Sequence, residues 1–327
     1  MKTIILKQFI LFLNKTSIMV GGQAVMNGVM MRVPGFYATA VRDPKSNIVI
    51  NRCEHKSFVE LYHLSNIPII RGFLHLVDSM KIGFKTLEWS AEISEEDTSK
   101  NVIVNFLMTI FSICFAISIF MVIPYFITQL SINKYAGLSN NEFLFNTFAG
   151  LLRIMVFLLY LYLISKLQEI QNLFQYHGAE HKVVYNFESG KSLSPDNAKK
   201  FSTKHPRCGT SFVFILMLVT IITYAITDSF VSYLQLISFT IFSRILFHLA
   251  LLPIVAGIGY EVLKFLAKRQ DNIIFSFLSK PGLLLQNITT NEPDKDQLEV
   301  SIAALKAAFG DDLKQFEGQQ FNADAIG

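Results

Sequence analysis

The chain has 327 residues, of which 51% are hydrophobic and only 17% charged, and phenylalanine alone contributes 30. The apolar residues are gathered in long blocks, a distribution typical of polytopic membrane proteins. The formal net charge of +4 is small for this length, and basic residues are not interleaved with aromatic ones, so nucleic-acid binding has no support. Three cysteines, far apart along the chain, indicate no disulfide framework.

The N-terminal part, before the long apolar blocks, predicts a leader and a small folded element. Residues 1–20 contain a short apolar run that is interrupted by a lysine and therefore resembles a signal peptide only poorly. An alternative is that translation starts at Met19. The Gly-punctuated stretch Gly21–Arg32 lacks the ending of a phosphate-binding loop, so its glycines are expected to permit turns or close backbone approach. Two β-prone runs, Tyr37–Arg42 and Ile48–Cys53, flank a turn-rich segment and predict a β-hairpin.

Helical periodicity dominates the rest of the chain. Apolar residues at spacings of three and four from Ile67 to about Glu92 predict an amphipathic helix, too polar to span, on the membrane or on the bundle. Four later blocks are long enough to cross a bilayer: Val102–Ile132, Phe143–Ser165, Phe212–Ile237 and Phe239–Phe265. A last helix is expected from about Asp296 to Phe309, ended by Gly310. The expected fold is an all-α membrane protein with about four transmembrane helices, cytosolic amphipathic helices and a small N-terminal β-hairpin element.

Charge predicts the orientation of these spans. The two short connections on the other side of the membrane are nearly free of basic residues. The segment between the second and third spans carries seven: Lys166, Lys182, Lys191, Lys199, Lys200, Lys204 and Arg207. The positive-inside rule then places this segment and both termini in the cytosol. The expected division is a leader (1–20), an N-terminal cytosolic element (21–100), two spans (101–166), a cytosolic metal-site segment (167–211), two further spans (212–268) and a cytosolic tail (269–327).

The stretch Tyr176–Lys182 contains the pattern H-x-x-E-H. In a helix, His177 and His181 stand at i and i+4 on one face, with Glu180 on its flank. This is the inverted form of the zinc-peptidase signature, in which two histidines bind Zn²⁺ and the glutamate polarises a water molecule. Downstream, His205 and Cys208 form a knuckle before the third span that could present two more ligands.

These four residues could form either of two kinds of zinc site. Manganese and iron are alternative ions. If His177, His181, His205 and Cys208 all bind, the site is closed and structural; if three bind, a position stays open and Glu180 becomes catalytic. Plain hydrogen-bonded polar residues are a third possibility. Glu261, at the end of the fourth span, is a fifth candidate ligand, but it reaches the pair only if the second helix bends. Without that bend it is expected to pair with Arg207 or a lysine.

Arg153, Arg244 and His248 lie inside the apolar blocks. Such residues are costly in a membrane unless they are paired or face a wet cavity. A transport pathway would use them, but interhelical hydrogen bonding or snorkelling is the favoured interpretation.

Several of these motifs, in this order, resemble the bacterial YqhQ-like family of multi-pass membrane proteins: Gly21–Arg32, His177–Lys182, His205–Ser211, Gly259–Glu261, and Leu285–Thr290 through Glu299–Val300. The resemblance covers nearly all of residues 20–310. It implies a metal-dependent enzyme without an established reaction, with His177, Glu180, His181, His205 and Cys208 as its functional set. One departure is Asn27, where the family usually has glutamate.

Together these observations predict an inner-membrane zinc-dependent hydrolase whose site faces the cytosol. Its expected partners are the lipid bilayer, a substrate and another membrane protein. The alternative is a non-enzymatic membrane scaffold or assembly factor with a structural metal site, and a transporter is the third interpretation.

Overall fold

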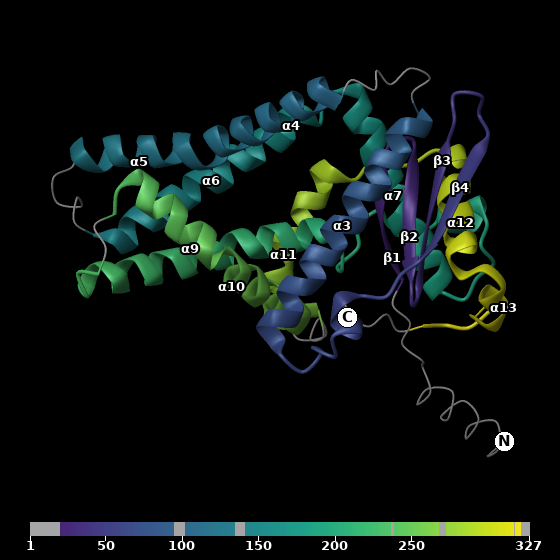
Figure 1. Ribbon diagram of the computed structural model, residues 1–327. Coiled ribbons are helices and arrows are strands. Elements are labelled where there is room, and N and C mark those ends of the chain that lie inside the picture. Colours follow the sequence, from purple (N-terminus) through teal and green to yellow (C-terminus); the bar gives the residue numbers. More distant parts are fainter. Residues whose placement is uncertain are drawn as a thin grey trace, which may run out of the picture.

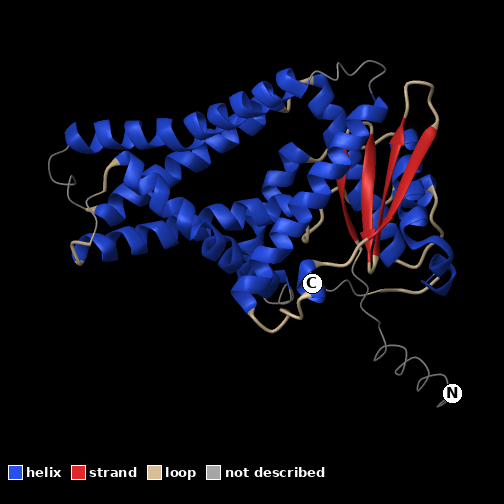
Figure 2. Cartoon of the chain, viewed as in Figure 1, coloured by secondary structure: helices blue, strands red, loops and turns tan. Residues whose placement is uncertain are grey.

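The computed structural model describes residues 20–94, 102–134, 141–236, 239–267, 273–316 and 318–321. Apart from Val20, the predicted leader lies outside these residues. The described chain is mostly helical, with one small antiparallel sheet (Figures 1 and 2). Long apolar helices extend to one side, and the sheet lies on the other, flanked by helices from the N-terminal, central and C-terminal parts of the chain.

The sheet is an antiparallel meander in the order β1-β2-β3-β4: β1 (Gly21–Val25), β2 (Gly28–Val33), β3 (Phe36–Arg42) and β4 (Ile48–Glu54). The predicted hairpin is confirmed as β3 and β4, in which Tyr37 pairs with Cys53. The glycine-rich stretch forms a second hairpin, β1 and β2, that periodicity did not predict. Its turn places Asn27 at a φ of 50°, a left-handed conformation that asparagine adopts more readily than most residues.

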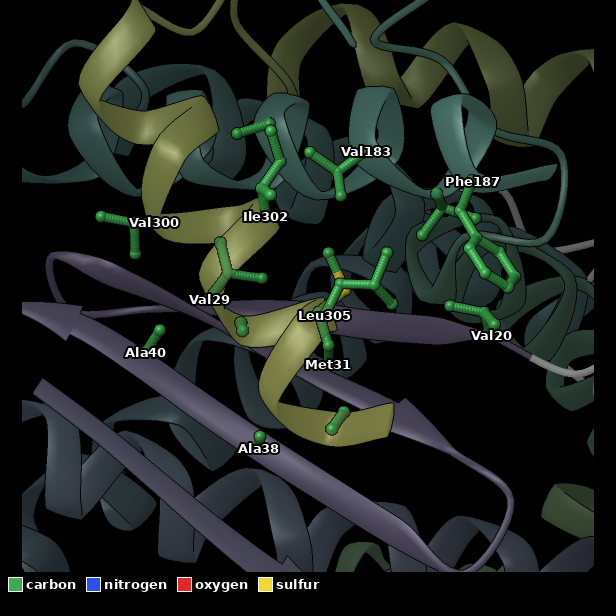
Figure 3. Close-up of a cluster of buried hydrophobic side chains, with 14 of the residues drawn as sticks. Val20, Val29, Met31, Ala38, Ala40, Val183, Phe187, Val300, Ile302 and Leu305 are labelled. Atoms are coloured by element: carbon green, nitrogen blue, oxygen red, sulfur yellow. The ribbon is translucent and has the colours of Figure 1, made fainter. Parts of the chain in front are cut away.

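Helices cover both faces of this sheet. On one face lie α7 (Gln168–Glu188) and α12 (Lys295–Phe309), on the other α3 (Pro68–Ser94). Alternate residues of β2 divide between the faces: Met31 is buried against α7 and α12, and Met30 against α3. Leu298 and Leu305 of α12 are almost fully buried in the first core, and the burial of each contributes about 1.5–3 kcal/mol. Figure 3 shows Leu305 among the side chains of this core. The C-terminal helix therefore fixes α7 to the N-terminal sheet.

Four spans of the described chain are long and apolar enough to cross a membrane, as predicted: Phe106–Ser131, Glu142–Ile164, Gly209–Tyr233 and Ile241–Leu266. The first comprises α4 (Val102–Ile117), a π-helical turn η1 (Ser118–Val122) and α5 (Ile123–Lys134). The π turn ends two residues before Pro124, which has no backbone N–H to continue the helical ladder. The others are α6 (Glu142–Ile164), α9 (Gly209–Tyr233) and α10 (Ile241–Ala267).

The amphipathic helix α3 packs on the bundle, along α10, rather than only on the membrane surface. Two glycines let the backbones meet: a Cβ atom on Gly72 would lie 2.9 Å from the Gly257 carbonyl oxygen. Next to this crossing, His75 stacks on Tyr260 with ring centroids 5.3 Å apart. The remaining elements are α2 (Phe58–Leu61), α8 (Pro195–Ala198), α11 (Ile273–Thr289), η2 (Gly310–Asp312) and α13 (Leu313–Phe316).

Candidate metal centre

The helix that carries the H-x-x-E-H motif is separate from the span before it. Helix α6 ends at Ile164, and α7 begins at Gln168 after Leu167 adopts an extended conformation. Helix α7 can therefore leave the direction of α6 and pack against the sheet. Gly178 lets the chain after α11 approach closely, because a Cβ atom there would lie 2.0 Å from the Asn291 carbonyl oxygen. The Asn291 amide donates a hydrogen bond to the carbonyl oxygen of Phe174 at 2.9 Å.

Three of the predicted ligands converge. One donor atom each from His177, His181 and Cys208 lies within 4.8 Å of the other two. His177 Nε2 and Cys208 Sγ are 3.1 Å apart. The histidines come from one face of α7, and Cys208 is the N-cap of α9, so its Sγ atom lies at the positive end of the helix dipole.

Backbone carbonyl oxygens orient both imidazoles. The Nδ1–H group of His177 donates to the Thr289 carbonyl oxygen at 2.8 Å, and Nδ1 of His181 donates to the Thr203 carbonyl oxygen. A carbonyl oxygen only accepts, so each Nδ1 carries the proton and each Nε2 keeps its lone pair. Metal-binding histidines characteristically have their second nitrogen held in this way. The arrangement therefore leaves two Nε2 atoms ready to bind a cation.

The donor set fits zinc. In a tetrahedral zinc site the metal lies about 2.0–2.1 Å from an imidazole nitrogen and about 2.3 Å from a thiolate sulfur. These bond lengths place the donor atoms roughly 3.3–3.8 Å from one another. The three donor atoms, within 4.8 Å of one another, need only small side-chain movements to reach that spacing. Two imidazoles and one soft sulfur also favour zinc over magnesium or calcium, which prefer oxygen ligands.

Glu180 lies beside these donors in a buried position. Its Oε2 atom is 3.4 Å from His181 Nε2. Burial raises the pKa of Glu180 to about 7, opposed by the nearby charges of His177 and Arg207 and by a hydrogen bond from the Gly22 backbone. A Cβ atom on Gly22 would lie 2.9 Å from Glu180 Cγ, so the glycine of β1 makes room for this carboxyl group.

His205, the fourth predicted ligand, is held by other partners. Arg207 Nη2 donates to His205 Nε2 at 3.0 Å, and the Arg207 backbone N–H faces His205 Nδ1 at 3.4 Å. Burial, followed by the charge of Arg207, keeps the pKa of His205 well below its usual value. Arg207 is fixed in turn by Glu188. The His205 ring stays near the cluster, with its centroid 5.4 Å from that of His181, but it is not one of the three converging donors.

Glu261, the fifth predicted ligand, is also engaged elsewhere. Its two carboxylate oxygens accept hydrogen bonds from Arg71 Nε at 2.8 Å and Arg71 Nη2 at 2.6 Å. The partner differs from the expected Arg207 or lysine because α3, not the central segment, packs along this part of α10. Although the chain does bend between α6 and α7, Glu261 is therefore not one of the converging donors.

Residues that hold the ligands were not predicted as site residues. Gln286 of α11, fully buried, accepts from the His205 backbone N–H at 2.8 Å and donates to the His205 carbonyl oxygen at 2.8 Å. Buried Lys182 donates to the carbonyl oxygens of Lys199 and Phe201, which fixes the segment leading to His205. Gln286 lies in the run Leu285–Thr290, which the sequence marks only through its resemblance to a family motif.

Asn27 stabilises the fold near α7. Its side-chain oxygen accepts a hydrogen bond from Asn172 Nδ2 at 2.8 Å, and Asn172 in turn accepts from Gln297 of α12. The residue thus links the β1–β2 turn to α7 and α12. It is not among the three converging donors.

The fold and the site define a multi-pass helical membrane protein with a cluster of potential metal ligands at the end of its third span. Residues 67–311 match the family model DUF1385, described as a protein of unknown function, and the chain belongs to this family. It is 29% identical over 297 residues to the uncharacterized protein YqhQ of Bacillus subtilis (strain 168), covering 86% of this chain and 89% of that protein. No solved structure matches the chain.

Proposed function

We propose that this chain is a metal-dependent hydrolase, with zinc as the expected ion, acting at the cytosolic face of a bacterial inner membrane. The observation that carries the proposal is the convergence of His177, His181 and Cys208 while His205 is occupied by Arg207. Three protein ligands with an open fourth position are typical of catalytic zinc sites, whereas structural sites usually have four.

The protein groups around this position suit hydrolysis. An ion bound by the three ligands would supply a Lewis acid that activates water and polarises a carbonyl or phosphoryl oxygen. Glu180 would accept the proton of the attacking water and return it to the leaving group. Its carboxyl group is buried beside the donors, with Oε2 3.4 Å from His181 Nε2, so it lies within reach of a water that the ion would hold.

The position of the site favours a substrate that is itself associated with the membrane. Cys208 directly precedes α9, the third of the four apolar spans, so the ligands lie at the membrane boundary. The seven basic residues between α6 and α9 support the cytosolic orientation. We therefore expect an amphiphile or membrane protein whose hydrolysable bond lies at headgroup level.

One observation favours a second candidate, a membrane scaffold with a structural zinc site. The His205 ring is adjacent to that of His181, so a rearrangement of Arg207 could free its nitrogen as a fourth ligand. A closed site would leave Glu180 without water to activate. The protein would then act through its surface, with another membrane protein as the expected partner.

Metal analysis of the detergent-purified full chain tests the proposal. We expect one zinc ion per chain, lost in His177→Ala and His181→Ala and retained in His63→Ala, a matched control because His63 is exposed. Unchanged zinc content in both site variants would remove the hypothesis.

Glu180→Gln separates catalysis from structure. It should keep the zinc and abolish hydrolysis of responsive substrates in a panel of lipid esters and phosphoesters followed by mass spectrometry. Equal turnover by Glu180→Gln and the unaltered protein would contradict the proposed role of Glu180. A zinc-containing protein inert toward the whole panel would favour the scaffold.

A further inference from the structure

The strand β1 forms one edge of the sheet, because it pairs only with β2 among the strands of the described chain. Figure 1 shows this edge on the side of the sheet nearest the long apolar helices. Helix α7 contacts β1 from one face of the sheet and α3 from the other, which leaves the outer edge without a neighbouring strand. Such an edge presents a row of backbone N–H and C=O groups to which an extended chain can add as a further strand.

The register identifies which backbone groups of β1 point outward. Val25 and Gly28 flank the two-residue turn and exchange both hydrogen bonds, so bonded and non-bonded pairs alternate along the hairpin from there. Gly22 and Ala24 belong to the non-bonded pairs, and their N–H and C=O groups therefore point away from β2. The Gly22 N–H group agrees with this direction, because it donates to the carboxyl group of Glu180.

The outward groups are occupied at both ends of β1 and open between them. At the turn, the Met26 N–H donates to Ser90 Oγ at 3.1 Å, and the Met26 carbonyl oxygen accepts from Ser94 Oγ at 3.2 Å. At the other end, the Gly22 N–H is taken by the catalytic candidate of α7. Between these ends, no hydrogen bond within the described chain reaches the Gly22 carbonyl oxygen or the N–H and C=O groups of Ala24. Three backbone groups beside the candidate centre are thus open to a partner.

We infer that this edge binds the substrate, an extended segment of a membrane-anchored polypeptide that adds antiparallel to β1 and presents an amide bond to Glu180. The inference rests on the proposed hydrolase and chooses a polypeptide over a lipid-like amphiphile as its substrate. A peptide backbone carries donors and acceptors at the strand spacing of the three open groups, which a lipid ester does not. Gly22 is exposed in front of the buried Glu180, so the edge of β1 offers an approach to that carboxyl group.

The pairing also identifies the bond that is cleaved. The substrate residue opposite Ala24 exchanges both hydrogen bonds with it, and the substrate residue opposite Gly22 donates its N–H to the Gly22 carbonyl oxygen. The carbonyl group of this second residue finds the Gly22 N–H already taken by Glu180, so it stays free beside that carboxyl group. In the hydrolysis, a water oxygen bonds to this carbonyl carbon, the C–N bond breaks, and Glu180 passes the proton of the water to the leaving nitrogen. The scissile bond therefore follows the residue opposite Gly22.

Cleavage of a diverse pool of synthetic peptides by the detergent-purified full chain, followed by mass spectrometry, tests the inference. Ala24→Pro removes an outward N–H and leaves the bonds to β2 in place, because an edge strand tolerates proline where its N–H side faces outward. We expect this variant to keep its zinc and to cleave at least tenfold more slowly. Ile50→Pro is the matched control on the opposite edge strand, β4, and should cleave at the unaltered rate. The Ile50 N–H also points outward, by the alternation that the bond from the His55 N–H to the Gly35 carbonyl oxygen sets.

N-methylated peptides test the pairing without altering the protein, and so serve if Ala24→Pro fails to fold. In a peptide that the chain cleaves, the residue before the scissile bond and the residue two positions earlier direct their N–H groups to β1, and methylation of either nitrogen should block cleavage. The N–H of the residue between them points away from β1, so its methylation should be tolerated. Equal cleavage by Ala24→Pro and the unaltered protein, or the same response to all three methylations, overturns the pairing.

The panel of lipid esters and phosphoesters separates this inference from the proposed function. Lipid hydrolysis that depends on Glu180, with no peptide cleaved, would leave the hydrolase in place and show that its substrate is not a polypeptide. If the zinc-loaded chain hydrolyses neither peptides nor lipids, the proposed function itself is wrong, and the inference that rests on it is wrong as well.

Discussion

Gln286→Leu should weaken both the fold and the metal centre, because Gln286 fixes the loop that carries His205 and Cys208. The substitution removes two hydrogen bonds of 2.8 Å to the His205 backbone and one of 3.2 Å to the Ser211 hydroxyl. The buried His205 N–H group would have no partner, at about 1–3 kcal/mol, whereas the His205 carbonyl oxygen would lose one bond and keep the one from the Cys208 N–H at 3.2 Å. Since the Ser211 hydroxyl can rotate, we expect a total loss of roughly 2–4 kcal/mol.

The same substitution should also lower zinc affinity, because the loop that presents Cys208 loses its anchor. Removing a group that holds a metal ligand directly costs about 10–100-fold, and Gln286 acts one step further away, so we expect a loss of up to about 10-fold. Stability would be measured by thermal unfolding of the zinc-loaded protein in detergent, and affinity by competition with a chromophoric chelator. Gln171→Leu is the matched control, because Gln171 is exposed on α7, and its stability should change by less than about 0.5 kcal/mol. If Gln286→Leu matches the control in both measurements, Gln286 does not hold the loop.

Two further substitutions test the packing and the composition of the site. Gly178→Ala should destabilise the protein by about 1–3 kcal/mol, because its Cβ would lie 2.0 Å from the Asn291 carbonyl oxygen, whereas Gly21→Ala meets nothing within 4 Å. Equal unfolding temperatures for these two variants would contradict the close contact. Glu261→Gln should keep the bound zinc and cost about 1.5–3 kcal/mol, because it breaks the charged pair with Arg71. In a double-mutant cycle with Arg71→Gln the two losses should not add, and loss of zinc in Glu261→Gln would restore Glu261 as a ligand.

The membrane spans and the two-histidine helix could be predicted because their signals are local. Apolar length alone located all four spans, and the i, i+4 spacing placed His177 and His181 on one face of α7. The hairpin β3 and β4 followed from alternating β-prone residues around a turn. The hairpin β1 and β2 did not, because β1 begins with two exposed glycines, and β2 is buried on both faces and so lacks the alternation of polar and apolar residues.

The partners of the site residues could not be predicted, because they depend on contacts between distant segments. The sequence predicts that Glu261 binds the metal only if the chain bends between α6 and α7. Its actual pairing with Arg71 depends instead on the crossing of α3 and α10 at Gly72 and Gly257. His205 has the chemistry of a ligand in the sequence, and only the position of Arg207 shows where its nitrogens point.

X-ray absorption spectroscopy of the zinc-loaded protein is the most direct test of a three-ligand centre formed by His177, His181 and Cys208. We predict a coordination shell of one sulfur and two imidazoles, with a light non-protein atom in the fourth position, and the same shell in His205→Ala. A shell of one sulfur and three imidazoles that loses one imidazole in His205→Ala would show a closed site. That result would contradict the hydrolase and leave the metal with a structural role.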